Sequence, residues 1–230
     1  MLARVLLGLA LFAATPLISH AAVINGNFET GNLTGWSSLG SAHVVTASFG
    51  VTPTEGTYQG YIETTGNFTA MASAIVPFLG LTGSDIMALG QGAPTNGTGI
   101  SQDITVSAGD TLFFDWNFLT DELNEEATFN DFAFLAVNGT AFLLSSRNTG
   151  TFDMTSPPAG FDGQTGWSTD SYNFATGGTF KIGFGVFNVG DSGHNSVLLL
   201  DAIHVPVPEP ATFVLMALAL PLVFLRKRRS

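Results

Sequence analysis

The chain contains no cysteine, and its central part has almost no basic residues. The absence of cysteine excludes disulfide bonds, thiol catalysis and zinc sites with cysteine ligands. Between residues 22 and 207 the only basic side chains are Arg147 and Lys181, against 17 acidic ones (18 in the chain, minus Glu209), a net charge of −15. Because a phosphate backbone is bound through clustered lysine and arginine, this balance excludes nucleic-acid binding.

The patterns that accompany common catalytic chemistries are also missing. There is no Gly-x-Ser-x-Gly sequence for a serine nucleophile, and no glycine-rich loop that leads into a helix and could hold a phosphate. The histidines His43, His194 and His204 lack the spacing of metal ligands. A glycosidase needs two facing carboxylates, but 17 acidic residues contain such pairs by chance. We therefore predict that the protein is not an enzyme, and keep glycan hydrolysis as a minor alternative.

The N-terminal segment has the three parts of a secretory signal. Arg4 supplies a positive charge, Val5 to Ala14 form an apolar run, and Ser19-His20-Ala21 place small residues before a cleavage point. Residues 1–21 are therefore predicted to be a signal helix that the secretion machinery removes. The alternative is a buried N-terminal helix.

The C-terminal segment, residues 206–230, combines prolines, an apolar run and a basic end. The 15 residues from Ala211 to Leu225 would form a helix of about 22 Å, shorter than a hydrocarbon core of about 30 Å. The basic residues that follow should stay in the cytoplasm, which places the rest of the chain outside; they are Arg226, Lys227, Arg228 and Arg229. A span this short suggests transient insertion in the membrane.

This ending resembles the PEP-CTERM sorting signal of Gram-negative bacteria. The motif Pro208-Glu209-Pro210, the apolar span and the basic cluster stand in the family's order, and a signal peptide precedes them. The resemblance implies processing by an exosortase-like membrane enzyme. It also implies delivery from the inner membrane to the cell surface or the extracellular matrix, in bacteria that produce exopolysaccharide and biofilm. The alternative is an ordinary tail anchor.

Residues 22–205 read as a single all-β domain. Short runs that alternate apolar and polar residues are separated by Gly, Asn, Asp and Pro, as in a β-sandwich. The expected strands are Ala42–Ser48, Gln59–Thr64, Ile100–Val106, Thr111–Phe118, Asp131–Val137 and Thr179–Asn188. One alanine-rich segment, Phe68 to Val76, predicts a short helix that ends before Pro77.

Several pieces of this domain resemble the galactose-binding-like jelly rolls of carbohydrate-binding modules. Asn25 to Glu29 with Gly35-Trp36 is similar to their opening strand, and Leu198 to Ile203 is similar to their closing strand. The resemblance implies a jelly-roll-like β-sandwich and a sugar ligand. It also implies a structural Ca²⁺ near Glu29 and Asp201, because the first and last strands of such folds lie together. The alternative is that these two carboxylates only cap turns.

An acidic segment offers a second candidate calcium site. Its carboxylates lie within 11 residues, and oxygen ligands of this kind suit Ca²⁺; they are Asp121, Glu122, Glu125, Glu126 and Asp131. The spacing does not match an EF-hand. The alternative is a solvated loop between two strands.

Aromatic residues in polar surroundings are candidates for sugar stacking. Trp167, with Tyr172 nearby, has this setting, whereas Trp36 and Trp116 sit among apolar residues and are expected in the core. The alternative is that Trp167 belongs to the core or its rim. Taken together, the sequence predicts an exported protein with a structural or interaction role in an exopolysaccharide matrix. The first alternative is a calcium-stabilised carbohydrate-binding module.

Overall fold

The computed structural model describes residues 23–66 and 68–206. The predicted signal peptide, the membrane span and the Pro208-Glu209-Pro210 motif lie outside these residues. Within the described part of the chain, no helix has the length and apolar character needed to cross a membrane.

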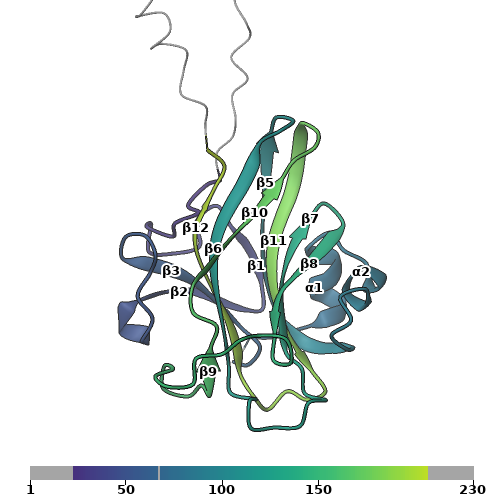
Figure 1. Cartoon of the computed structure of the whole chain (residues 1–230). Coiled ribbons are helices and arrows are strands. Elements are labelled where there is room, and N and C mark those ends of the chain that lie inside the picture. Colours follow the sequence, from purple (N-terminus) through teal and green to yellow (C-terminus); the bar gives the residue numbers. More distant parts are fainter. Residues whose placement is uncertain (1–22, 67, 207–230) are drawn as a thin grey trace, which may run out of the picture.

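The fold is a sandwich of two six-stranded sheets in which all strand pairings are antiparallel (Figure 1). The first sheet has the order β1–β5–β11–β7–β8, with β4 also paired to β5, and the second has the order β10–β6–β12–β3–β2, with β9 also paired to β6. The strands of the first sheet are β1 (Ser37–Leu39), β4 (Ala70–Met71), β5 (Pro94–Val106), β7 (Phe132–Val137), β8 (Thr140–Ser146) and β11 (Gly178–Val189). Those of the second are β2 (Ser41–Thr46), β3 (Tyr58–Glu63), β6 (Thr111–Thr120), β9 (Gly163–Gln164), β10 (Ser168–Asn173) and β12 (Ser196–His204). The predicted all-β sandwich is confirmed.

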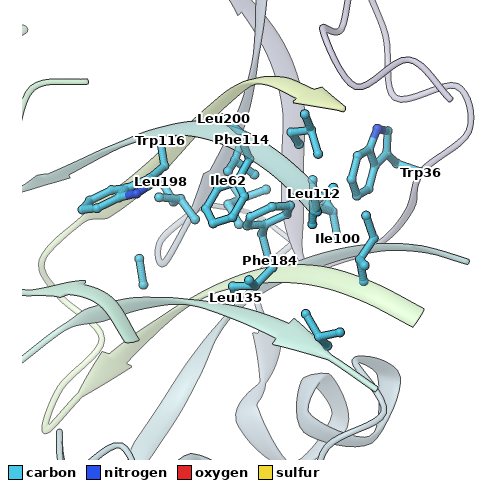
Figure 2. Close-up of a cluster of buried hydrophobic side chains, with 14 of the residues drawn as sticks. Trp36, Ile62, Ile100, Leu112, Phe114, Trp116, Leu135, Phe184, Leu198 and Leu200 are labelled. Atoms are coloured by element: carbon cyan, nitrogen blue, oxygen red, sulfur yellow. The ribbon is translucent and has the colours of Figure 1, made fainter. Parts of the chain in front are cut away.

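The main core lies between the two sheets (Figure 2). Alternate residues of each strand point inward, as the period of two requires. Strand β6 contributes Leu112, Phe114, Trp116 and Phe118, β11 contributes Ile182, Phe184 and Val186, and β12 contributes Leu198 and Leu200. Trp36 and Trp116 are each only 7% exposed, which confirms their predicted place in the core.

Two short helices cover the outer face of the first sheet (Figure 1). They are α1 (Ala72–Phe78) and α2 (Gly83–Met87), and Ile75, Leu79 and Ile86 pack there against a set of phenylalanines from β7 and β11. The expected helix at 68–76 is shifted, because residues 70–71 pair with β5 instead. The predicted end before Pro77 is wrong. Pro77 lies inside α1, where its missing N–H removes one hydrogen bond near the end of a seven-residue helix.

The expected opening strand at Asn25–Glu29 is also wrong, since this segment forms turns. Asn25 and Phe28 have φ angles of 52° and 56°, which a strand does not allow. These turns let the Phe28 ring reach the core, where it is fully buried and stacks on Trp36 with 6.0 Å between ring centroids. Burial of this aromatic ring offsets the cost of the left-handed backbone.

The outer face of the second sheet carries a third apolar cluster. Tyr61, Leu119, Val197 and Leu199 project from its strands and are buried beneath loop residues. The covering side chains are Phe49, Val51, Phe161 and Trp167, of which Phe49 belongs to the short 3₁₀ helix η1 (Ala47–Phe49). This cluster fills a sheet face that would otherwise be open to solvent.

Candidate functional site

The acidic segment connects β6 to β7, and it is not the uniformly solvated loop that one reading of the sequence allowed. Glu122 and Asp131 are fully buried, whereas Glu125 and Glu126 are exposed. The backbone N–H of Asp131 donates to Glu122 Oε2 at 3.3 Å, and Asp131 Oδ1 accepts from the Val189 N–H at 2.9 Å. Glu122 Oε1 is buried without any hydrogen-bond partner. The β6–β7 connection thus holds two carboxylates inside the protein and leaves one oxygen unsatisfied.

Burial dominates the electrostatics of this pair. Removal from water raises the pKa of Glu122 to about 7 and the pKa of Asp131 to about 8, and repulsion from neighbouring carboxylates, including that of Asp191, adds to both. Among residues 23–66 and 68–206, no basic side chain forms an ion pair with either group. The nearby Arg147 instead donates from Nε to the main-chain oxygen of Glu122 at 3.1 Å.

A polar network continues from Asp131 toward one end of the sandwich. With its nitrogen facing the carboxylate, the Asn188 amide donates from Nδ2 to Asp131 Oδ2 at 2.7 Å and to Thr64 Oγ1 at 3.0 Å. The side chains of Asn188 and Asn96 lie 3.1 Å apart, and Asn96 Nδ2 donates to the Thr64 carbonyl at 3.0 Å. The buried acid pair is therefore linked to residues near the protein surface.

The remaining member of the acidic segment, Asp121, lies closer to solvent. Its Oδ1 accepts from the Asn195 N–H at 2.7 Å and lies 3.3 Å from His194 Nδ1, while His194 Nε2 lies 3.7 Å from Glu125. Burial lowers the pKa of His194, but Asp121 and Glu125 outweigh it, so the net effect is a raised pKa. In the described part of the chain, no three His, Cys, Asp or Glu side chains are arranged to hold a metal ion.

Glu29 and Asp201 fix opposite ends of one loop, residues 54–58. Glu29 Oε1 accepts from the N–H groups of Thr57 and Tyr58, both at 2.8 Å. Asp201 Oδ2 accepts from the Glu55 N–H at 2.9 Å, and Oδ1 accepts from the Ala202 N–H at 2.8 Å. Asp201 is fully buried, which raises its pKa to about 6. Because N–H donors already occupy both oxygens of Asp201, this pair fits a calcium ion less well than Glu122 does.

Trp167 and Tyr172 belong to different parts of the molecule. The Trp167 indole Nε1–H donates to the Thr52 carbonyl at 2.9 Å, and its ring joins the cluster on the outer face of the second sheet. Tyr172 lies on the edge strand β10, where its ring packs against the main core. The two aromatics therefore do not form one stacking platform.

A cavity lies among the loops at one end of the sandwich, and we call it the end cavity. Its volume is about 620 Å³. It is lined by Thr65, Gly66, Thr69, Ala70, Met71, Thr95, Asn96, Asp191 and Ser192. Phe68 and Met71, on the same segment, are 78% and 65% exposed. Asp191 Oδ1 is buried without a hydrogen-bond partner.

Sequence reasoning missed the end cavity, because its lining comes from three segments far apart in the chain. The nearest signal was Asn96-Gly97-Thr98, which stands out only as an N-glycosylation pattern. Pairing of β4 with the start of β5, and of β5 with the end of β11, brings the three segments together.

No family model and no curated protein matches the sequence. Solved structures that resemble the fold include the carbohydrate-binding module TmCBM61 in complex with β-1,4-galactotriose (16% identity, TM-score 0.43, 80% of this chain and 96% of that chain). Another is the K1 cleaved adhesin domain of Lys-gingipain from Porphyromonas gingivalis (15% identity, TM-score 0.45, 83% of this chain and 99% of that chain). A third is the module CBM27-1 of Caldicellulosiruptor saccharolyticus in complex with mannohexaose (11% identity, TM-score 0.41, 82% of this chain and 97% of that chain). Similarity at this level assigns no ligand to this chain, and the fold rests on the strand pairing described above.

Proposed function

We propose that the protein is an exported, non-catalytic component of an exopolysaccharide matrix, and that its jelly-roll-like body contacts glycan through the end cavity. The observation that carries this proposal is the composition of that cavity. Hydroxyl, amide and carboxylate groups line it, and exposed apolar side chains lie on the segment that contains Phe68 and Met71.

This combination suits a sugar better than a purely apolar or an anionic ligand. A sugar ring presents hydroxyl groups around its rim and apolar C–H groups on its faces, and ligand pockets of about 300–1,000 Å³ combine both kinds of contact. The net charge of −15 between residues 22 and 207 (2 basic and 17 acidic side chains) disfavours anionic ligands. The alternative, a structural protein without specific sugar contact, predicts no saturable binding.

The arrangement of carboxylates supports a role without catalysis. Glycosidases place two carboxyl groups about 5–9.5 Å apart on either side of the bound sugar. Glu122 and Asp131 are held together but fully buried, so a glycosidic bond cannot reach them. Asp191 is the one carboxylate among the residues that line the end cavity.

The placement of the described chain ends is compatible with sorting. Val23 lies near Ile203 and His204 at the end of β12, and the described chain ends two residues after this strand, at Pro206. Asp191 and Ser192 precede the start of β12, so the end cavity lies at the other end of this strand. We propose that secretion machinery and an exosortase-like enzyme act on the two terminal segments, with transient insertion in the inner membrane before release to the surface or the extracellular matrix. A tether at residue 206 would leave the cavity accessible.

We also propose that Ca²⁺ stabilises the body. Among the predicted ligands, Glu122 fits best, because its Oε1 is buried without a partner and Asp131 lies beside it. A bound Ca²⁺ would supply the positive charge that neither carboxylate receives through an ion pair with a described basic side chain.

The test is equilibrium binding of residues 22–206, which contain all three apolar clusters, to purified exopolysaccharide of the host, with Ca²⁺ present. Ser192→Trp would fill the cavity from an exposed position and should weaken binding about tenfold, or about 1.4 kcal/mol. Thr179→Trp, exposed where β11 begins, is the matched control and should bind as the wild type does. Equal binding by both variants would contradict the assignment of the cavity, and no binding by the wild type would contradict glycan contact itself.

A further inference from the structure

A second cleft opens along one side of the sandwich, between the edge strands of the two sheets. Strand β8 ends the order of the first sheet, and β10 begins the order of the second. At this cleft the rings of Phe142 on β8 and Tyr172 on β10 contact each other in a tilted arrangement, with 5.4 Å between centroids and an interplanar angle of 60°. The cleft encloses about 330 Å³, at the lower end of the range for ligand pockets. We call it the side cleft.

The apolar wall of the side cleft is unusual for a surface. Phe142 is 38% exposed, and among the described residues Phe68 is the other phenylalanine that is exposed. Leu144 and Tyr172 continue the wall, and Tyr172 is held by Phe174, whose ring centroid lies 5.0 Å from its own. An aromatic face that is fixed from behind and open in front is suited to stack on the apolar face of a sugar ring.

A positioned carboxylate stands at the same cleft. Asp170 Oδ2 accepts from the indole Nε1–H of the buried Trp116 at 2.8 Å, so the core fixes the direction of this exposed side chain. In the described structure Asp170 Oδ1 forms no hydrogen bond. The nearby Asn173 donates its amide hydrogens to Thr111 Oγ1 and the Gly109 carbonyl, which leaves Asn173 Oδ1 as a second acceptor. Both groups accept hydrogen bonds, which hydroxyl groups can donate.

We infer that the side cleft is a second sugar subsite, which takes one or two uncharged pyranose rings. A ring would stack on Phe142 and donate hydroxyl hydrogens to Asp170. The carboxylate and the acidic surroundings exclude uronic acids and sulfated sugars by repulsion. The inference rests on the proposed function, because it assumes that the body contacts glycan, but it names a site and a sugar class that the end cavity does not determine.

Two separate subsites would let one body join two glycan segments. The end cavity is built from the residues between β3 and α1, the start of β5 and the loop between β11 and β12, whereas the side cleft is built mainly from β8 and β10. Because no residue is shared, each subsite can be removed without the other. Joint engagement raises the apparent affinity for a polymer above that of either subsite alone.

The experiment uses calorimetric titration with uncharged oligosaccharides from partial hydrolysis of the host exopolysaccharide. In the Ser192→Trp background, residual binding should fall about tenfold with Phe142→Ala, and also with Asp170→Asn, which keeps an acceptor for Trp116. Met154→Ala, a substitution at another exposed apolar residue, is the control and should leave the residual binding unchanged. Unchanged melting temperatures show that the variants fold.

The outcomes separate the two claims. Residual binding that survives both Phe142→Ala and Asp170→Asn overturns the side cleft and leaves the end cavity intact. Loss of all binding in the Ser192→Trp variant, in which the side cleft is unaltered, also overturns the side cleft and leaves the end cavity intact. A wild-type protein that binds none of these oligosaccharides overturns the proposed function and the second subsite together.

Discussion

Replacing Glu122 with glutamine should make the protein more stable at alkaline pH. Burial raises the pKa of Glu122 from 4.5 to about 7 in the folded state. Such a carboxyl makes its full contribution to stability only at pH values below 4.5, the pKa that it has in the unfolded chain. That stability is lost as pH rises from about 4.5 through 7. The rise in pKa from 4.5 to about 7, at 1.36 kcal/mol per pH unit, corresponds to about 3 kcal/mol, a large part of a typical free energy of unfolding of about 5–15 kcal/mol. Glu122→Gln removes the charge while keeping an oxygen to accept the Asp131 N–H.

The assay is urea unfolding of residues 22–206 at pH 5.5 and pH 8.5 in the presence of a chelator. We expect the wild type to lose stability between the two pH values by several kcal/mol, since Asp131, Asp201 and His194 also have raised pKa values and act in the same direction. Glu122→Gln should reduce this loss by about 2 kcal/mol, because only about 1.5 of the 2.5 pH units between the two pKa values lie above pH 5.5. Glu126→Gln, on the exposed part of the same loop, is the control and should reproduce the wild-type dependence.

Two results would refute this reasoning. One is a wild-type free energy of unfolding that stays constant between pH 5.5 and 8.5. The other is a Glu122→Gln variant that is destabilised equally at both values, which would show that Glu122 acts through its shape and hydrogen bonding and not through its charge.

Three further predictions concern calcium, packing and processing. Adding excess Ca²⁺ after chelation should raise the melting temperature of the wild type but not of Glu122→Gln, because a ligand that binds only the native state stabilises it; an unchanged wild type would argue against calcium. Gly97→Ala should cost about 2 kcal/mol and lower the melting temperature by about 4–8 °C, because the new Cβ would clash with the Val186 carbonyl oxygen. In the control Gly83→Ala the new Cβ meets no atom within 4 Å, so the melting temperature should change little. Equal effects of the two substitutions would show that the strands can move apart. Mass spectrometry of surface material should find the mature protein without its last 20 or so residues, and an intact end at Ser230 would contradict exosortase-like processing.

The sequence predicts the β-sandwich well where strands alternate cleanly. Residues 59–64 and 100–106 follow the pattern, and β3 and β5 cover most of them. Strand β10 was not predicted, because its residues, Ser168 to Asn173, are polar and largely exposed. Strand β1 has only three residues, and the pattern gave no sign of α2.

The candidate sites were harder to predict, because tertiary structure decides them. Glu122 and Asp131 appear in the sequence as members of an acidic segment, and only the turn between β6 and β7 buries these two while leaving Glu125 and Glu126 in solvent. Trp167 and Tyr172 are close in sequence, but they lie in different clusters. Proximity along the chain therefore does not predict which of these side chains lie together in the fold.

The central claim is that the body contacts glycan through the end cavity. Co-crystallisation of residues 22–206 with an uncharged oligosaccharide from the host exopolysaccharide tests it most directly. We expect a sugar between the residues around Thr69–Met71 and Asp191-Ser192, with hydroxyl groups near Asn96 and Asp191. A sugar bound at Trp167 on the outer face of the second sheet, with the end cavity filled only by water, would refute glycan contact through the end cavity.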